Sequence, residues 1–226
     1  MPVSSSTSEP AARLAILISG AGSNMVAIAR ACAAGEIPAQ VAAVLCDVPD
    51  AGGIARAREL GLPVRVVDRR AFRRDGAADR AAFEAALDAA ITASDADYVI
   101  LAGFMRVLSA ELVGRYAGRM LNIHPSLLPK YKGLDTHARA LAAGDAEHGA
   151  SVHFVTPELD GGPVIAQGVV PVLPGDTVAS LSARVHAVEH RLYPMVIQWL
   201  TSGRLQWNEG RPTLDGGPLA APARLS

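Results

Sequence analysis

Short apolar runs separated by amphipathic stretches cover most of this chain. The stretch that begins at Arg80 shows the helical pattern, because Phe83, Leu87 and Ile91 recur every fourth residue and form one apolar face. Strands that alternate with such helices indicate an α/β domain with a largely parallel sheet. The apolar runs that we predict as buried strands are Leu14–Ile18, Val41–Cys46, Val64–Val67, Tyr98–Ala102 and Met120–His124.

The C-terminal half departs from this pattern. Ser151–Thr156 alternates between apolar and polar residues, and Val164–Val170 returns from a tight loop, so this part of the sheet is expected to be mixed or antiparallel. A long helix with one apolar stripe is predicted from Thr177 to about Ser202. We therefore expect a Rossmann-like, three-layer α/β/α fold with a mostly parallel sheet and a mixed C-terminal part.

Length and composition favour one folded domain with two short extensions. The chain has 226 residues, 50% of them hydrophobic, which is sufficient for a single large core. Residues 13–210 carry the periodic pattern and form the predicted domain. Residues 1–12 are rich in Ser and lack the basic and apolar regions of a signal peptide, so we expect a disordered leader. Residues 211–226 are rich in Pro and Gly and are expected to form a loose tail.

Charge and cysteine usage argue against several kinds of partner. The formal net charge of −1 gives no reason to expect nucleic acid or an anionic membrane. No apolar run approaches the roughly 20 residues that span a bilayer. Cys32 and Cys46 lack metal-ligand spacing, and we interpret them as buried, reduced thiols of a cytoplasmic protein. An apolar sheet edge is compatible with a homodimer as well as with a monomer.

A glycine-rich turn, Ser19–Asn24, separates the first predicted strand from the first helix. Free amide hydrogens and the helix dipole at such a turn favour a phosphate. The turn is not a P-loop, and Met25 stands where a dinucleotide-binding motif needs its third glycine. Asp47, which ends the next strand, is either an ordinary turn residue or the reader of a ribose. A monophosphate fits this pattern better than a dinucleotide.

Asn122 and His124 are candidate catalytic residues. In a strand at Met120–His124 their side chains share one face, while Leu121 and Ile123 point into a core. A proline ends the strand, and α/β sheets bind ligands at the carboxyl ends of their parallel strands. Asn can donate to a developing oxyanion and His can move a proton, which suits acyl or formyl transfer. The alternative is a turn-capping Asn and a structural His.

Three other segments carry candidate site residues. The loop Gly103–Leu108 is mostly apolar and can line a pocket for a flat aromatic ligand, with core packing as the alternative. Arg80 begins a helix, where it either meets an anion or is solvated. Two glycines follow Asp160 in a tight loop, which indicates either close approach to a ligand or turn chemistry alone. His153 is interpreted as a structural residue.

Four segments together resemble one enzyme family, the folate-dependent phosphoribosylglycinamide formyltransferases of purine synthesis. Each segment is weak to moderate in specificity alone, but the set in this order is highly specific, and the similarity runs from about Leu14 to Asp215. The resemblance implies the formyltransferase fold and transfer of the formyl group of 10-formyltetrahydrofolate to the amine of glycinamide ribonucleotide. The segments are Ile18–Asn24, Leu101–Arg106, Leu121–Pro129 and Ser151–Pro163.

The resemblance also implies roles for individual residues. Asn122, His124 and Asp160 would be the catalytic set, with the Asp160 carboxylate favouring the protonated form of His124. No metal is implied. His186 departs from the family pattern, in which a polar, non-titrating residue is expected. The ribonucleotide would be held by Gly22, Ser23, Asn24, His186 and Glu189. The formyl folate would be held by Arg80, Met105, Arg106, Val107, Leu108, Thr156 and Asp160, together with Asn122.

Related activities are the alternatives. A formyltetrahydrofolate hydrolase would use water in place of the amine and would need an additional N-terminal domain, for which a first strand near residue 14 leaves no room. A methionyl-tRNA formyltransferase would need a basic C-terminal domain for RNA, and a sugar-nucleotide formyltransferase would need room for a nucleotide diphosphate. The alternative that is not an enzyme is a nucleotide-binding module built on Gly20–Asn24 and Asp47.

Overall fold

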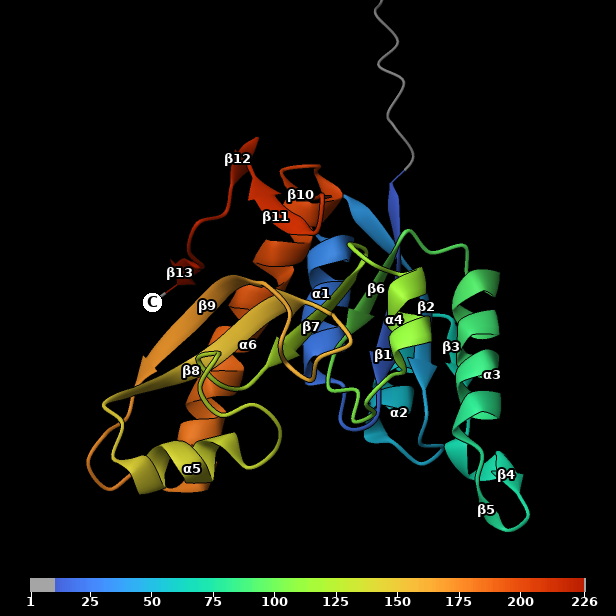
Figure 1. The fold of residues 1–226 in the computed structure, drawn as a ribbon, viewed down its shortest axis with the longest axis horizontal. Coiled ribbons are helices and arrows are strands. Elements are labelled where there is room, and N and C mark those ends of the chain that lie inside the picture. Colours follow the sequence, from blue (N-terminus) through green and yellow to red (C-terminus); the bar gives the residue numbers. More distant parts are fainter. Residues whose placement is uncertain (1–10, 226) are drawn as a thin grey trace, which may run out of the picture.

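The structure, a computed structural model, describes residues 11–225 and places an eight-stranded sheet at the centre of the molecule (Figure 1). Its strands are β1 (Ala12–Ile18), β2 (Ala39–Cys46), β3 (Val64–Val66), β6 (Tyr98–Leu101), β7 (Met120–His124), β8 (Glu147–Phe154), β9 (Val164–Pro171) and β13 (Ala223–Leu225). They lie in the order β13-β9-β8-β7-β6-β1-β2-β3. The strands from β3 to β7 across the sheet are parallel, whereas β8 runs antiparallel to both β7 and β9. The predicted mostly parallel sheet with a mixed C-terminal part is confirmed.

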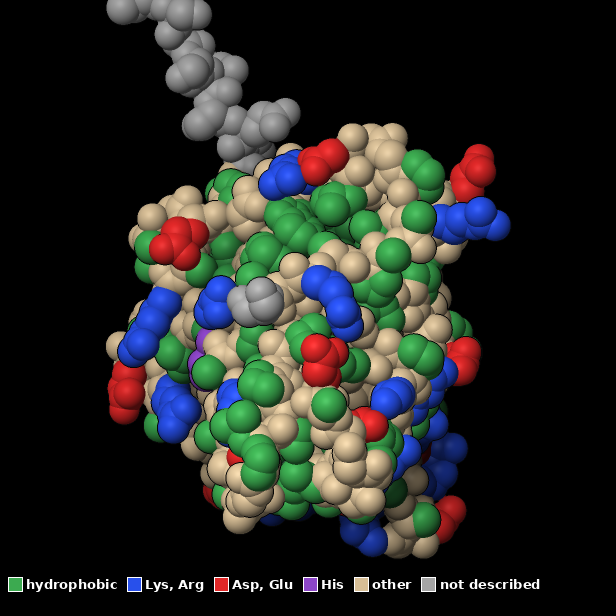
Figure 2. Space-filling view, turned by 90° about the vertical axis from the view of Figure 1, so that its left-hand side faces the viewer, with side chains coloured by type: hydrophobic (Ala, Val, Ile, Leu, Met, Phe, Trp, Pro, Cys, Tyr) green, Lys and Arg blue, Asp and Glu red, His purple; other side chains and the backbone are tan. Residues whose placement is uncertain are grey.

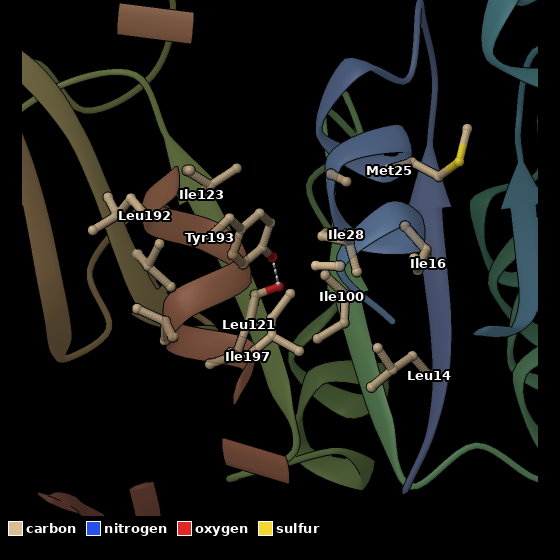
Figure 3. Close-up of a cluster of buried hydrophobic side chains, with 14 of the residues drawn as sticks. Leu14, Ile16, Met25, Ile28, Ile100, Leu121, Ile123, Leu192, Tyr193 and Ile197 are labelled. Carbon is tan, nitrogen blue, oxygen red and sulfur yellow. Dashed lines mark hydrogen bonds between the residues drawn. The ribbon is translucent and has the colours of Figure 1, made fainter. Parts of the chain in front are cut away.

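Helices cover both faces of this sheet and give the predicted three layers. Side chains alternate along β1, so Leu14 and Ile16 pack into the core on one face and Ala15 and Leu17 into the core on the other. The first core, part of which Figure 3 shows, includes residues of α1 (Ser23–Ala33), α2 (Gly52–Glu59) and α6 (Val178–Thr201). The second includes residues of α3 (Arg80–Ala93) and α4 (Ala110–Arg115). A further helix, α5 (Thr136–Ala143), packs against α6.

Several helices begin at residues whose side chains cap them. The side chain of Ser109 accepts a hydrogen bond from the amide of Leu112 at the start of α4. Thr177 and Ser180 form a reciprocal capping box at the start of α6. Gly144 ends α5 with a φ of 67°, a left-handed conformation that glycine adopts without a steric penalty. The start of α6 agrees with the predicted one because a capping box depends on local sequence.

Tyr193 links α6 to β6 and β7 through hydrogen bonds. It is fully buried, and its hydroxyl lies 3.0 Å from the carbonyl oxygen of Leu101 and 3.1 Å from that of Leu121. Figure 3 shows the contact with Leu121. The first carbonyl closes β6, and the second immediately precedes Asn122 in β7. Glu189 lies about one helical turn before Tyr193, so this contact brings its face of α6 beside the exit of β7.

The C-terminal segment corrects one prediction. The structure differs from the expected loose tail at residues 211–226, because residues 211–214, 217–218 and 223–225 form strands. Residue 226 lies outside the described residues. Trp207 packs on Phe154 with ring centroids 4.8 Å apart, so contacts that are distant in sequence stabilise these short strands. β10 (Leu205–Asn208), β11 (Arg211–Leu214) and β12 (Gly217–Pro218) form a separate antiparallel sheet, while β13 extends the main sheet beside β9.

The folded domain begins slightly earlier than expected, and the connection before α3 contains short elements of its own. Residues 1–10 of the predicted leader lie outside the described residues, and residue 12 already belongs to β1. The segment before α3 contains a short 3-10 helix (Arg69–Ala71) and a small hairpin made by β4 (Arg73–Arg74) and β5 (Ala77–Ala78). This hairpin lies at the lower right of Figure 1.

Surface and composition features agree only in part with the expectations. Among residues 11–225, none of the helices combines the length and apolarity needed to cross a membrane. On the face that Figure 2 shows, Lys and Arg side chains are interspersed with Asp and Glu instead of gathering into one basic patch. Cys32 and Cys46 are both free thiols, but only Cys46 is buried, so the prediction of a buried pair is right for one of the two.

Candidate active site

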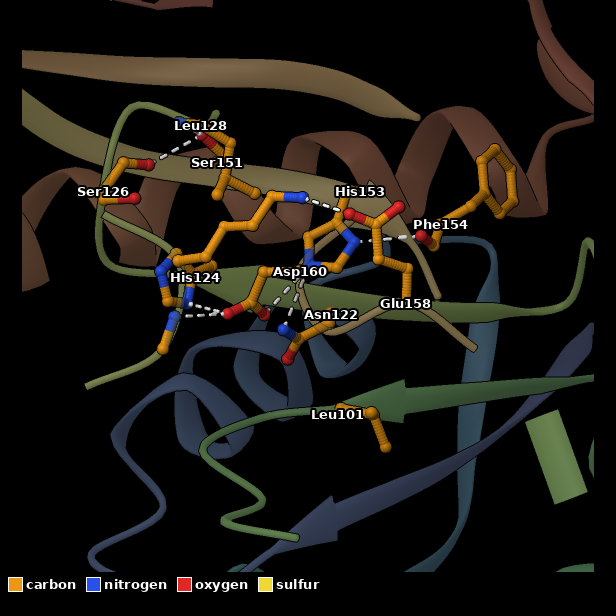
Figure 4. Close-up of polar contacts among 12 residues, drawn as sticks. Leu101, Asn122, His124, Ser126, Leu128, Ser151, His153, Phe154, Glu158 and Asp160 are labelled. Carbon is orange, nitrogen blue, oxygen red and sulfur yellow. Dashed lines mark hydrogen bonds and ion pairs between the residues drawn. The ribbon is translucent and has the colours of Figure 1, made fainter. Parts of the chain in front are cut away.

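Asn122 and His124 leave the end of β7 on one face of the sheet (Figure 4). Leu121 and Ile123, the alternate residues of this strand, point to the other face and belong to the core under α6, as the period of two predicts. Asn122 is partly buried and His124 is 6% exposed. The strand therefore presents an amide and an imidazole side by side at the carboxyl end of the parallel part of the sheet, where α/β proteins bind ligands.

Asp160 approaches His124 from the loop between β8 and β9 (Figure 4). Its Oδ2 lies 3.4 Å from His124 Nδ1 and accepts a hydrogen bond of 2.9 Å from the amide of Gly133. His124 Nε2 lies 2.9 Å from the carbonyl oxygen of Tyr131, which can only accept, so this nitrogen carries a hydrogen. Both ring nitrogens of His124 therefore face oxygen acceptors.

His153 joins this group, although its sequence context predicted only a structural role. It is 2% exposed and stands opposite Asn122 in the antiparallel ladder of β7 and β8. Its Nδ1 donates to the carbonyl oxygen of Phe154 at 2.9 Å, so in the neutral ring Nε2 accepts from the Asn122 amide nitrogen, 3.1 Å away. Burial lowers the pKa of His153 and keeps the ring neutral. His153 thereby orients the Asn122 amide and leaves its second hydrogen available.

An apolar cavity of about 100 Å³ opens beside Asn122 and Asp160. Phe104, Leu108 and Val155 are among its walls. Pockets that enclose a small ligand usually exceed about 300 Å³, so this cavity accommodates only part of one. Apolar walls combined with polar side chains such as Asn122 and Asp160 fit the edge of a flat aromatic ring system that carries polar atoms.

Most, but not all, of the residues predicted to bind folate lie at this cavity. Met105 is not among the residues that line the cavity. Its side chain is 61% exposed, and its backbone amide donates to the hydroxyl oxygen of Ser19 at 2.9 Å. Arg80 also points elsewhere, because it pairs with Glu84 at 2.7 Å in a separate hollow between α3 and α4. The predicted residues that do line the cavity are Arg106, Val107, Leu108, Asn122, Thr156 and Asp160.

The residues predicted to hold the ribonucleotide lie around the start of α1. Gly22 precedes the helix with a φ of 69°, and Ser23 begins it. The Asn24 side chain turns inward and donates to Glu189 Oε2 at 2.9 Å, so α1 and α6 meet through these two residues. Burial raises the pKa of Glu189, which is 4% exposed. His186 is exposed on α6, one turn before Glu189.

Two further observations delimit the site. Within residues 11–225, no group of three or more His, Cys, Asp or Glu side chains is arranged to hold a metal ion. A larger hollow of about 590 Å³ lies around Tyr131, His148 and Arg224, but its described lining includes none of the candidate catalytic residues. The polar chemistry therefore centres on the smaller cavity at the end of β7.

Comparison with known proteins agrees with this geometry. The family model described as formyl transferase matches residues 12–197. The chain is 50% identical over 206 residues to the phosphoribosylglycinamide formyltransferase of Escherichia coli, covering 91% of this chain and 95% of that protein. The structure of the phosphoribosylglycinamide formyltransferase of Coxiella burnetii matches with a TM-score of 0.89 at 44% identity, covering 96% of this chain and 100% of that one. A glycinamide ribonucleotide transformylase of Symbiobacterium toebii matches with a TM-score of 0.86 at 42% identity, covering 92% and 95%.

Proposed function

The chain belongs to the formyl transferase family, and from this premise we propose that it transfers the formyl group of 10-formyltetrahydrofolate to the amine of glycinamide ribonucleotide in purine synthesis. The observation that carries the proposal is that Asn122 and Asp160 line one cavity while His124 lies 3.4 Å from Asp160 Oδ2. An oriented amide donor and an imidazole paired with a carboxylate are the groups that formyl transfer requires.

Asn122 and His124 stabilise the charge that the reaction develops. A bond forms between the amine nitrogen and the formyl carbon, and the bond from that carbon to N10 of the folate breaks. Negative charge collects meanwhile on the formyl oxygen. Asn122 donates its free amide hydrogen to this oxygen, and the His124 imidazolium adds positive charge nearby. A preorganised donor of this kind typically lowers the activation free energy by about 3–4 kcal/mol.

Asp160 accepts the proton that the attacking amine loses. Its Oδ2 is occupied by His124 and Gly133, while its Oδ1 lies on the side of His153, 3.8 Å from Nε2. We assign to Oδ1 the removal of the amine proton, because it is the less engaged of the two oxygens. The proton then passes to N10 of the folate, which leaves as the neutral amine, and the site returns to its starting state.

The two substrates approach this centre from different sides. The cavity takes the edge of the pterin, and Arg106, Val107, Leu108 and Thr156 form our proposed folate contacts. Met105 and Arg80 are omitted from that set because they point elsewhere. The amide hydrogens at the start of α1 bind the phosphate of the ribonucleotide, with Gly22 and Ser23 at the turn. Glu189, with the exposed His186 beside it, faces the ribose or glycyl end.

The free thiols support a location for this reaction. Cys32 and Cys46 are unpaired in the structure. Thiols stay reduced in the cytosol and pair more readily in secreted proteins. We therefore place the enzyme in the cytoplasm.

One assay tests the proposal. Purified protein is mixed with 10-formyl-5,8-dideazafolate, a stable analogue of the formyl donor, and release of the deformylated product is followed with and without glycinamide ribonucleotide. Release that requires the ribonucleotide is the expected result. The formylated ribonucleotide should appear in equal amount, because each transfer consumes one of each substrate.

The same assay distinguishes the alternative activities. Release without the ribonucleotide indicates a formyl folate hydrolase, in which water replaces the amine. No release with folded protein returns attention to a nucleotide-binding module, and a titration with mononucleotides and NAD then tests that function. Replacing the ribonucleotide by an amino-sugar nucleotide or by methionyl-tRNA tests the remaining formyl acceptors.

A further inference from the structure

Asp47 is a buried carboxylate for which the proposed reaction has no use. It follows β2, is only 1% exposed and lies close to two arginines, contacts that the interpretations as a turn residue or a ribose reader did not include. Arg106 Nε lies 3.0 Å from its Oδ2, and Arg69 Nε lies 3.6 Å from the same oxygen. Among the described residues, neither carboxylate oxygen receives a hydrogen bond of good geometry. The two arginines are therefore what compensates this buried charge.

Arg106 carries the pairing into the segment that walls the cavity, residues 103–108, which we call the cofactor loop. Its side chain is 34% exposed and lines the cavity that also contains Asn122. Arg69, by contrast, belongs to the 3-10 helix before α3 and lies outside the described lining of that cavity. Only one of the two arginines thus connects Asp47 with the cavity.

Other contacts secure the two ends of the cofactor loop, because Phe104 and Leu108 are buried in the second core. The amide of Ser19 donates to the carbonyl oxygen of Gly103, and the amide of Met105 donates to the Ser19 hydroxyl. The side chains on either side of Arg106 contribute little packing, because Met105 is 61% exposed and Val107 is 58% exposed. The middle of the loop therefore depends on the ion pair with Asp47.

The burial of Asp47 makes this dependence strong. Water does not solvate the carboxylate, so removal of its charge leaves the Arg106 guanidinium without its nearest counter-charge. An arginine that is partly exposed and has lost its counter-charge turns toward solvent, where its charge is hydrated. Because Arg106 belongs to the wall of the cavity, such a movement of its side chain changes the shape of the wall.

We propose that Asp47 is a positioning residue for folate binding, whose ion pair with Arg106 fixes the cofactor loop in the shape that receives the pterin. This inference rests on the proposed function. It assigns no part in the chemical step to Asp47, which touches neither the reacting atoms nor the catalytic group. Its loss should therefore affect formyl folate binding more than turnover.

Asp47→Asn tests the proposal, with Asp50→Asn as the matched control. Asp50 is the acidic residue three positions later, but its side chain is 89% exposed and lies only within 4.0 Å of Arg70. We expect Asp47→Asn to raise the KM for 10-formyl-5,8-dideazafolate by about tenfold, with kcat and the KM for the ribonucleotide changing less than about twofold. Asp50→Asn should match the wild type. An unchanged folate KM in soluble Asp47→Asn would overturn the proposal.

A double variant separates positioning from a general loss of stability and remains informative if Asp47→Asn does not fold. Removing both charges of a buried pair is better tolerated than removing one. If Asp47 acts through Arg106, then Asp47→Asn combined with Arg106→Gln has the same folate KM as Arg106→Gln alone, because there is no arginine left to position. A further rise in the double variant contradicts the proposal.

The wild-type enzyme separates this inference from the proposed function. If the wild type fails to transfer the formyl group to the ribonucleotide, then the proposed function is wrong. If the wild type transfers it and Asp47→Asn has the wild-type folate KM, then only the role of Asp47 is wrong. Direct titration of each variant with the folate analogue, without ribonucleotide, should show the same loss of affinity as the KM values.

Discussion

The Asn122 amide nitrogen lies 3.1 Å from Nε2 of His153, at directly opposed positions of the antiparallel strands β7 and β8. An asparagine amide has an accepting and a donating end, and the two are exchanged by a half-turn of the side chain. The neutral imidazole accepts at Nε2 and therefore holds the donating end in place. This relationship gives the site an oriented donor before any substrate arrives, which is the condition for electrostatic stabilisation without reorganisation.

The first prediction concerns the donor itself. Asn122→Ala should lower kcat by about 10²–10³ with little change in either KM, because removal of one oxyanion donor has an effect of that size. Asn208→Ala is a control, since Asn208 is exposed in the C-terminal hairpin and bonds only to Thr213. Steady-state kinetics provide the measurement, and near-normal turnover of Asn122→Ala excludes the oxyanion role.

A double-mutant cycle then tests the orienting role of His153. His153→Ala should lower kcat in the wild-type background, because the amide of Asn122 becomes free to turn. In the Asn122→Ala background the same change should have almost no further effect on kcat, because residues in one hydrogen-bond network are not additive. Additive effects of the two substitutions show that His153 acts on the reaction independently of Asn122.

The second prediction concerns the charge beside His124. Asp160→Asn keeps an oxygen that can accept from the Gly133 amide but removes the negative charge that lies 3.4 Å from His124 Nδ1. We expect kcat to fall by about 10²–10⁴, the range of proton-transfer groups. Asp95→Asn removes a carboxylate whose side chain is 95% exposed and lies 3.8 Å from Arg13, away from the residues that line the cavity, and should change kcat less than about twofold. Equal effects of the two variants would exclude a specific role for Asp160.

How far these assignments follow from the sequence depends on which contacts are local. The period of two within Met120–His124 predicts that Asn122 and His124 share a face, because strand geometry alone determines it. The two glycines after Asp160 singled it out, but its pairing with His124 entered only through the family resemblance, since no local pattern relates residue 160 to residue 124. His153 was missed because the register of β8 against β7 is a tertiary property.

The same distinction accounts for the other differences. The ion pair of Arg80 with Glu84 was readable, because residues four apart are neighbours on a helix, but the sequence argument considered Arg80 only as an anion ligand or as solvated. Asp47 looked like part of a turn because the arginines that surround it come from two other connections. The segment of β11 and β13 was expected to be loose because it is rich in Pro and Gly, whereas short strands are stabilised by their partners rather than by propensity.

The third prediction concerns the phosphate turn. Gly22→Ala places a side chain on a residue with a φ of 69°, where the new Cβ would also lie 3.1 Å from the Cα of Gly53. We expect the KM for the ribonucleotide to rise by about tenfold with a smaller effect on kcat, because the strain shifts the amides that bind the phosphate. Gly20→Ala is the matched control, since its Cβ would meet nothing within 4 Å. A rise confined to the folate KM would place the phosphate elsewhere.

The fourth prediction concerns His148, which is 1% exposed and whose Nε2 lies 3.1 Å from Nδ1 of His137. Burial, and then the charge of His137, lower the pKa of His148 to about 4, with Asp145 opposing and His124 adding to the shift. Between pH 4 and about 6.5, the ordinary pKa of histidine, the unfolded chain thus binds more protons than the folded one. The free energy of unfolding should then decrease as the pH falls through this window, by up to about 3 kcal/mol for this residue.

Urea unfolding at pH 7.5, 6, 5 and 4 measures this loss of stability. His148→Gln removes the titrating ring and should make the free energy of unfolding less dependent on pH in the same window, whatever its cost at pH 7.5. If His148→Gln and the wild type show the same pH dependence, then burial of His148 contributes nothing to acid sensitivity, and carboxylates must account for it.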